Sequence, residues 1–282
     1  MRSIVILGAG ELGGALARQL AAKNVASRIV IVDEARTVAE GKALDIRQAS
    51  PIDGYHAEVV GSSDESTVVG ADAIVLADRA SGSAAEWQGD LGLALVQRVA
   101  YLNQGAMIVC AGAMQVDIVE RGVREAGMHR ARLFGSAAEG LRSAIVAMTA
   151  LEAGCNPSEV SLIVVGRPPN EIIVPWDEAA IGGRRATGVL SAASVARLDG
   201  RLPRLWPPGP LTLATAAAQL LAVADRHGRD GLSVFVATPR DVGEAGRVAM
   251  MPVTVGPAGV VQLLAPTLST RDRVRLDTVL RR

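Results

Sequence analysis

A short apolar run followed at once by a glycine-rich turn opens the chain and limits the folds that it can adopt. Residues 3–7 read Ser-Ile-Val-Ile-Leu, and the next six residues, Gly8 to Gly13, follow the pattern G-x-G-x-x-G. Apolar residues then recur at helical spacing as far as Ala21. A buried strand, a glycine turn and a helix in this order predict the first unit of a dinucleotide-binding fold.

Each glycine of the turn has a separate task in such a unit. Gly8 permits the tight turn, Gly10 lets the main chain approach a pyrophosphate, and Gly13 lets the helix and strand pack closely. Glu11 and Leu12 lie in the first turn of the helix, where free N–H groups and the positive dipole end attract phosphate. The cofactor-binding residues predicted here are these five.

An acidic residue at the end of the next apolar run adds to this set. Residues 28–32 read Arg-Ile-Val-Ile-Val and end on Asp33. A carboxylate at this point accepts hydrogen bonds from a ribose 2′-hydroxyl, whereas a 2′-phosphate would meet a like charge. The sequence therefore predicts NAD rather than NADP as the cofactor. The alternative is a glycine-rich turn in a fold that has lost its ligand.

Alternating strand and helix signals extend this unit through the first half of the chain. Such alternation predicts a doubly wound parallel sheet of Rossmann type, in the α/β class. The expected strands are 3–7, 28–32, 57–60, 72–77, 106–110 and 131–134, and the expected helices include 37–48, 86–103 and 116–126.

The second half has a different pattern, which predicts an α+β domain. A proline-rich segment at 203–210 precedes an alanine-rich helix, and the turn at 255–260 predicts a hairpin. We place the domain boundary near residue 135, giving domains 1–135 and 136–282. The expected elements are helices 139–153, 211–225 and one from Thr270, with strands 159–165, 232–236, 247–255 and 259–264.

Composition argues against several kinds of partner. The 282 residues carry 29 basic and 29 acidic side chains, so no basic excess favours nucleic acid. No apolar run approaches the ~20 residues that span a bilayer, and the N-terminal run is a core strand rather than a signal peptide. Cys110 and Cys155 lack the spacing of metal ligands, which favours reduced thiols in a cytoplasmic protein without a metal site.

Short motifs occur in order along nearly the whole chain: Gly41-Lys42-Ala43-Leu44-Asp45, Ala49-Ser50-Pro51, Val116-Asp117, Glu139-Gly140-Leu141-Arg142, Gly182-Gly183 and Met251-Pro252-Val253. Together they resemble the lactate/malate dehydrogenase family. The resemblance implies NAD-dependent oxidation of a small 2-hydroxy acid, and a homo-oligomer (dimer or tetramer) in which the helix at 41–51 faces another subunit.

The chain departs from the family at three of four catalytic positions, so no catalytic residue is assigned. The family's G-E-H-G-D reads Gly166-Arg167-Pro168-Pro169-Asn170, which places Pro168 at the position of the catalytic histidine. The aspartate that orients this histidine reads Glu139, and the arginine of the mobile loop falls near Gln88. Only the arginine that binds the substrate carboxylate is kept, as Arg142.

Other charged residues leave alternatives open. Arg142 is predicted to bind a carboxylate or to pair with Glu139 three residues earlier on one helix face. Arg79 and Arg167 either add positive charge to the same cleft or are solvated. The three histidines, His56, His129 and His227, are predicted to be surface or capping residues.

Two functions follow. The first is an oxidoreductase acting on 2-hydroxy acids, with weak or altered activity because the base and the loop arginine are replaced. The second is a non-catalytic dinucleotide-binding protein, either a sensor or the partner subunit of an active paralogue.

Overall fold

The parallel half of the molecule is built as the alternation predicts. The computed structural model describes residues 1–81, 86–226, 228, 231–239 and 246–281. Strand β1 (Ser3–Leu7) lies between β2 and β4, and parallel pairing gives the order β3-β2-β1-β4-β5-β6. The other strands are β2 (Arg28–Val32), β3 (Glu58–Ser62), β4 (Ala73–Leu76), β5 (Met107–Cys110) and β6 (Leu133–Gly135). The strand order reverses between β1 and β4, which is where doubly wound sheets bind their ligands.

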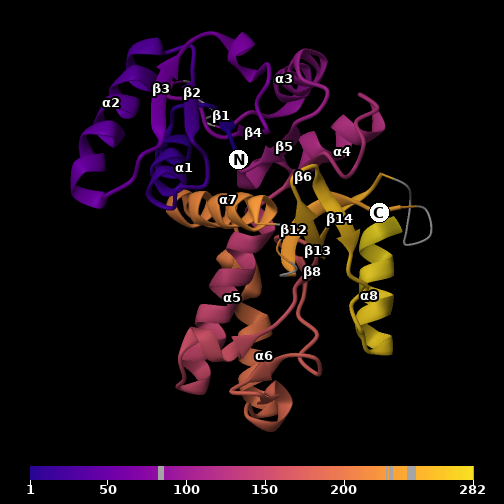
Figure 1. The fold of residues 1–282 in the computed structure, drawn as a ribbon. Helices are drawn as coiled ribbons and strands as arrows, with labels where there is room; N and C mark the ends of the chain where they lie inside the picture. The colour runs from indigo at the N-terminus through magenta and orange to yellow at the C-terminus, as the bar shows by residue number, and fades with distance from the viewer. Residues whose placement is uncertain (82–85, 227, 229–230, 240–245, 282) are drawn as a thin grey trace.

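The helices of this half cover both faces of the sheet (Figure 1). They are α1 (Glu11–Ala22), α2 (Arg36–Asp53), α3 (Gly89–Leu102) and α4 (Val116–Arg124). Helix α2 runs five residues past its expected end at 48, through Pro51. The helix expected from residue 86 begins at Gly89, because Glu86 pairs in an isolated bridge with Asp78 and is not helical.

The sheet continues from β6 into the second half through antiparallel pairing. Phe235 of β12 (Leu232–Ala237) lies opposite Gly135, and the order runs on as β12-β13-β8-β9. The hairpin expected at 255–260 joins β13 (Val248–Gly256) to β14 (Gly259–Leu263). The division into two domains at residue 135 stays a prediction.

The single strand expected at 159–165 is wrong. It is two strands, β7 (Val160–Ser161) and β8 (Val165–Arg167), in different sheets. Strand β7 pairs with β10 (Ala180–Ile181), which also pairs with β11 (Arg184–Arg185), whereas β8 pairs with β13 and β9 (Glu171–Ile173). An apolar run cannot show that its two ends join different partners.

The helices of the second half differ in how they lie relative to the sheet (Figure 1). Helices α5 (Ala137–Ala153) and α6 (Ala192–Arg201) project to one side, and α8 (Thr270–Arg281) lies against the antiparallel strands. The alanine-rich α7 (Pro210–Asp225) packs against both α1 and α5. None of the helices in the described ranges is long and apolar enough to cross a membrane.

Candidate functional site

The glycine turn is held tightly between the carboxyl ends of three strands. The N–H of Gly8 donates to Val32 at 2.7 Å, and Gly8 has a φ of 123°. A Cβ on Gly8 would lie 2.3 Å from the main-chain oxygen of Asp78, and one on Gly13 would lie 2.0 Å from the oxygen of Gly8. Only glycine fits at either position, because both contacts are with backbone that cannot yield.

The middle glycine faces the side chain of Asp78. A Cβ on Gly10 would lie 2.3 Å from the Cγ of Asp78. The carboxylate accepts hydrogen bonds from the N–H groups of Leu12 at 3.1 Å and Gly13 at 2.8 Å. Through these two hydrogen bonds the buried Asp78 caps α1 from a distant segment of the chain. The N-cap residue itself, Gly10, has no side chain to provide such a bond.

The sequence analysis does not place Asp78 at the glycine turn. The signal was present: an acid stands two residues after a buried strand that neighbours β1 at the switch point. The free N–H groups of a helix N-terminus attract such a carboxylate.

Asp33 lies beside the same turn and joins three loops. Its Oδ2 accepts from the N–H groups of Ala9 at 2.8 Å and Ala80 at 2.9 Å, and its Oδ1 accepts from Ala35 at 2.9 Å. The side chain is buried, with 6% of the residue exposed. A carboxylate has about four acceptor positions, so Oδ1 keeps capacity for a further hydrogen bond, and the ribose contact of Asp33 stays a prediction.

The segment after β4 lies against the ends of β1 and β5. The Glu86 carboxylate accepts from the N–H groups of Ala113 at 3.1 Å and Met114 at 2.8 Å. Burial raises the pKa of Glu86, these two N–H groups oppose that rise, and the charge of Asp78 adds to it. Residues 82–85 of this segment lie outside the described residues.

Trp87 and Arg79 complete this segment. The Trp87 indole Nε1 donates to the Leu7 carbonyl at 3.3 Å, and the Arg79 guanidinium lies 5.0 Å from the centroid of the Trp87 ring. The half-buried Arg79 is therefore held over an aromatic face, and the two alternatives for it, a charge in the cleft or a solvated side chain, stay predictions. Gln88, at the position of the family's loop arginine, is exposed at the start of α3.

Glu139 and Arg142 form an ion pair, which is one of the two alternatives predicted for Arg142. The Arg142 Nε donates to both Glu139 oxygens, at 3.0 and 2.9 Å, and Glu139 also accepts from the Ser233 N–H at 2.9 Å. The hydrogen bond with Glu139 raises the pKa of Arg142. Both residues line a cavity of about 610 Å³ between α5, α7 and the start of β12.

Pro168 lies in the turn between β8 and β9, and the residue before it has a structural partner. Arg167 donates to Glu120 at 2.7 Å, and Arg247 donates to the other oxygen of Glu120 at 2.8 Å. Burial raises the pKa of Glu120, but the arginine hydrogen bonds outweigh burial and hold it below its usual range. Arg167 is therefore paired, with 33% of its side chain exposed, and the two alternatives for it, a charge in the cleft or a solvated side chain, stay predictions.

Arg142 and the turn between β8 and β9 line different cavities. Pro169 and Asn170 line a hollow of about 260 Å³ with residues of α8, including Arg271 and Arg275. Arg142 lines the cavity of about 610 Å³ described above, which shares no lining residue with this hollow. Across the described residues, the structure does not join these positions into one substrate pocket.

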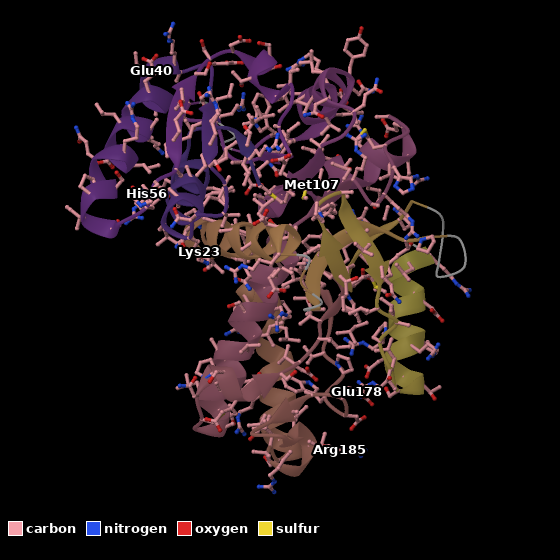
Figure 2. The ribbon with its side chains drawn as sticks, in the orientation of Figure 1. Lys23, Glu40, His56, Met107, Glu178 and Arg185 are labelled. Carbon is pink, nitrogen blue, oxygen red and sulfur yellow. The ribbon has the colours of Figure 1, made fainter. Side chains whose placement is uncertain are left out.

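The described histidines lie on the surface, and both cysteines are free thiols. His56 is exposed after the end of α2 (Figure 2), and the exposed His129 accepts from the N–H of Ala131 at 3.3 Å. His227 lies outside the described residues. Cys110 and Cys155 are free thiols, and burial raises the pKa of Cys110. No cluster of side chains suited to a metal ion is found in the part of the chain that the structure describes.

Comparisons with known proteins show which proteins this chain is similar to. Residues 2–100 match the model of the lactate/malate dehydrogenase NAD-binding domain. A malate dehydrogenase of Thermomicrobium roseum is 25% identical over 292 aligned positions, covering 98% of this chain and 94% of that protein.

Solved structures give the same fold. A malate dehydrogenase from Salinibacter ruber superposes with a TM-score of 0.85 at 18% identity, over 98% of this chain and 93% of that one. A lactate dehydrogenase from Cryptosporidium parvum, solved with lactic acid and nicotinamide adenine dinucleotide, has a TM-score of 0.86 at 20% identity, over 99% and 94%. Residues 2–100 therefore match the NAD-binding domain of the lactate/malate dehydrogenase family, and nearly the whole chain is similar to malate and lactate dehydrogenases in sequence and in fold.

Proposed function

We propose that this protein binds NAD and oxidises or reduces 2-hydroxy and 2-oxo acids only weakly, or with altered chemistry. The observation that carries the proposal is the state of Glu139 and Pro168. Glu139, at the position of the orienting carboxylate, is engaged by Arg142 and by the Ser233 N–H. Pro168 has no side-chain donor or acceptor and no main-chain N–H.

The missing groups matter because of the charge that hydride transfer creates. When a 2-hydroxy acid gives a hydride to the nicotinamide of NAD, its hydroxyl proton must go to a base. A positioned acid–base group contributes about 10²–10⁴ in rate. Gln88 is neutral and exposed, so it does not replace an arginine that stabilises charge on the substrate oxygen.

The glycine turn and Asp33 are of the type and position that hold NAD. The N–H groups of Leu12 and Gly13 would take the pyrophosphate, with Glu11 beside them at the start of α1. Asp33 would accept from a ribose hydroxyl through Oδ1, which favours NAD over NADP. Arg142 would hold a small carboxylate ligand once Glu139 releases it.

A non-catalytic role is the second candidate, and the closed Glu139–Arg142 pair favours it. A sensor or a partner subunit of an active paralogue needs the nucleotide site but not the base. We also propose a cytoplasmic homo-oligomer formed through α2, where Leu44 and Ile52 are 48% and 87% exposed. If sedimentation at micromolar concentration finds only a monomer of 29.2 kDa, the proposed oligomer is refuted.

Calorimetry and steady-state kinetics test the function. Titration with NADH should give binding, and titration with NADPH should give weaker binding. Assays with NADH and oxaloacetate or pyruvate should give turnover well below the ordinary enzyme range of about 1–10³ s⁻¹. Turnover inside that range would show that the base has been replaced by a group other than Pro168, and the proposal would fail.

A further inference from the structure

The N–H groups at the start of α1 already hold an anion that belongs to the chain. The two oxygens of Asp78 lie 3.1 and 2.8 Å from the nitrogens of Leu12 and Gly13. These are hydrogen-bond distances, and they are the distances that a phosphate oxygen would need at the same nitrogens. Two oxygens cannot share that position, so the carboxylate and a pyrophosphate exclude each other.

Gly10 gives a second, independent measure of the same overlap. The missing side chain at Gly10 leaves the space by which a pyrophosphate approaches the main chain of this turn. The Cγ of Asp78 lies 2.3 Å from where a Cβ of Gly10 would be, with its two oxygens at 2.3 and 2.6 Å. Asp78 therefore fills the space left by that glycine as well as bonding to the nearby donors.

The main chain around Asp78 is secured, so only its side chain is free to leave. The Asp78 carbonyl accepts from the Gly10 N–H at 2.8 Å, and the N–H of Ala77 donates to Leu7 at 2.9 Å. On the other side, the Ala80 N–H donates to Asp33 at 2.9 Å. These bonds come from β1, from the glycine turn and from the end of β2, and they hold residues 77–80 in place.

A displaced carboxylate would stay close to other negative charge. Glu86 pairs with Asp78 in an isolated bridge, and the charge of Asp78 contributes to the raised pKa of Glu86. Asp33 is also at this edge of the sheet, held by Ala9 and Ala80. Moving Asp78 off α1 therefore costs two charge-assisted hydrogen bonds and leaves three acidic residues and a diphosphate in one crevice.

We propose that Asp78 is a built-in competitor of the cofactor: NAD enters its cradle only when the Asp78 carboxylate leaves the N–H groups of Leu12 and Gly13. The inference rests on the NAD binding proposed above and adds an autoinhibitory contact to it. The free protein is the closed form, and the affinity for NAD is lowered by the stability of that contact.

The test compares NADH binding by calorimetry in the unaltered protein and in variants at two acidic positions. Asp78→Ala removes the competitor and should tighten NADH binding at least tenfold. Asp78→Asn keeps the shape but not the charge, so its affinity should lie between the other two. Asp72→Ala is the matched control, because Asp72 also accepts hydrogen bonds from two backbone N–H groups, those of Arg2 and Ser3. These lie at the amino ends of β1 and β4, away from the glycine turn.

Thermal unfolding adds a readout that does not depend on turnover. Without nucleotide, both alanine variants should unfold at lower temperature than the unaltered protein, because each loses two hydrogen bonds to a charged acceptor. Saturating NADH should raise the unfolding temperature of Asp78→Ala by more than that of Asp72→Ala.

The outcomes separate the two proposals. Equal NADH affinity in the unaltered protein and Asp78→Ala overturns the competitor and leaves NAD binding standing. The same gain in Asp72→Ala as in Asp78→Ala also overturns it, because the effect would then be general loosening. If none of the proteins binds NADH, including Asp78→Ala, both the NAD-binding function and the competitor are refuted.

Discussion

Replacing Glu139 by glutamine removes the charge that holds Arg142 and leaves the shape of the helix surface almost unchanged. The Arg142 Nε donates to both carboxylate oxygens, at 3.0 and 2.9 Å, and Glu139 is only 5% exposed. The glutamine oxygen can still accept from the Ser233 N–H, which lies 2.9 Å from the present carboxylate. The substitution therefore tests the ion pair rather than the packing.

The magnitude follows from how far the pair is buried. Breaking a fully buried ion pair costs about 3–5 kcal/mol, and a hydrogen bond to a charged group contributes about 1.5–3 kcal/mol. The Arg142 side chain is 26% exposed, so water recovers part of the loss. We expect Glu139→Gln to lower the free energy of unfolding by about 2–3 kcal/mol. For a chain of 282 residues, this corresponds to a fall in Tm of about 3–5 °C.

Differential scanning calorimetry measures this change against Glu40→Gln. Glu40 pairs with Arg36 on the outer face of α2 (Figure 2), where the two side chains are 45% and 68% exposed. That control should change stability by less than about 0.5 kcal/mol. A Glu139→Gln protein that melts within a degree of the Glu40→Gln protein would refute the reasoning. It would show that the Glu139–Arg142 pair is no stronger than a surface pair.

Three further changes test other charged groups. Glu120→Gln should cost about 3 kcal/mol in urea unfolding at neutral pH, because Arg167 and Arg247 lose a buried anion. Since the pKa of Glu120 is lowered, this difference should shrink as the pH falls through its folded pKa. The pKa of Glu86 is raised, so protonated Glu86 stabilises the fold below its ordinary pKa of 4.5, and this stabilisation is lost as the pH rises through the folded pKa. Glu86→Gln removes this titration, so the free energy of unfolding should change less with pH above 4.5. An unchanged dependence of stability on pH would contradict this prediction. Asp33→Ala should narrow the preference for NADH over NADPH in calorimetric titration, and tighter NADPH binding by the unaltered protein would remove the assignment.

The parallel half of the fold could be predicted from local sequence because its signals are local. Each buried strand is a continuous apolar run, and the glycine turn lies directly after the first one. The strands β1 to β6 and the helices between them follow this alternation, and the fold class is confirmed. The single strand expected at 159–165 is wrong because this one apolar stretch contributes strands to two different sheets.

The candidate site depends on contacts between distant segments, which no local pattern shows. Asp78 reaches Leu12 and Gly13 across more than sixty positions, and Arg167 reaches Glu120 across 47. The Glu139–Arg142 pair was predictable because the two residues are three apart on one helix. The family pattern directed attention to Pro168, Glu139 and Gln88, but it did not indicate that Asp78 and Glu86 accept hydrogen bonds from N–H groups at the carboxyl ends of the strands.

The packing of α7 on α1 has a consequence for how the chain is made. Helix α7, residues 210–225, comes from the second half but covers a face of the first helix of the nucleotide-binding unit. Leu213, Ala217 and Leu220 are buried in the finished protein. During translation, the N-terminal half leaves the ribosome well before α7 exists, so the face of α1 that α7 will cover is exposed to water for that interval. The parallel sheet can assemble early, but it becomes a finished structure only when a segment nearly two hundred residues later arrives to cover it.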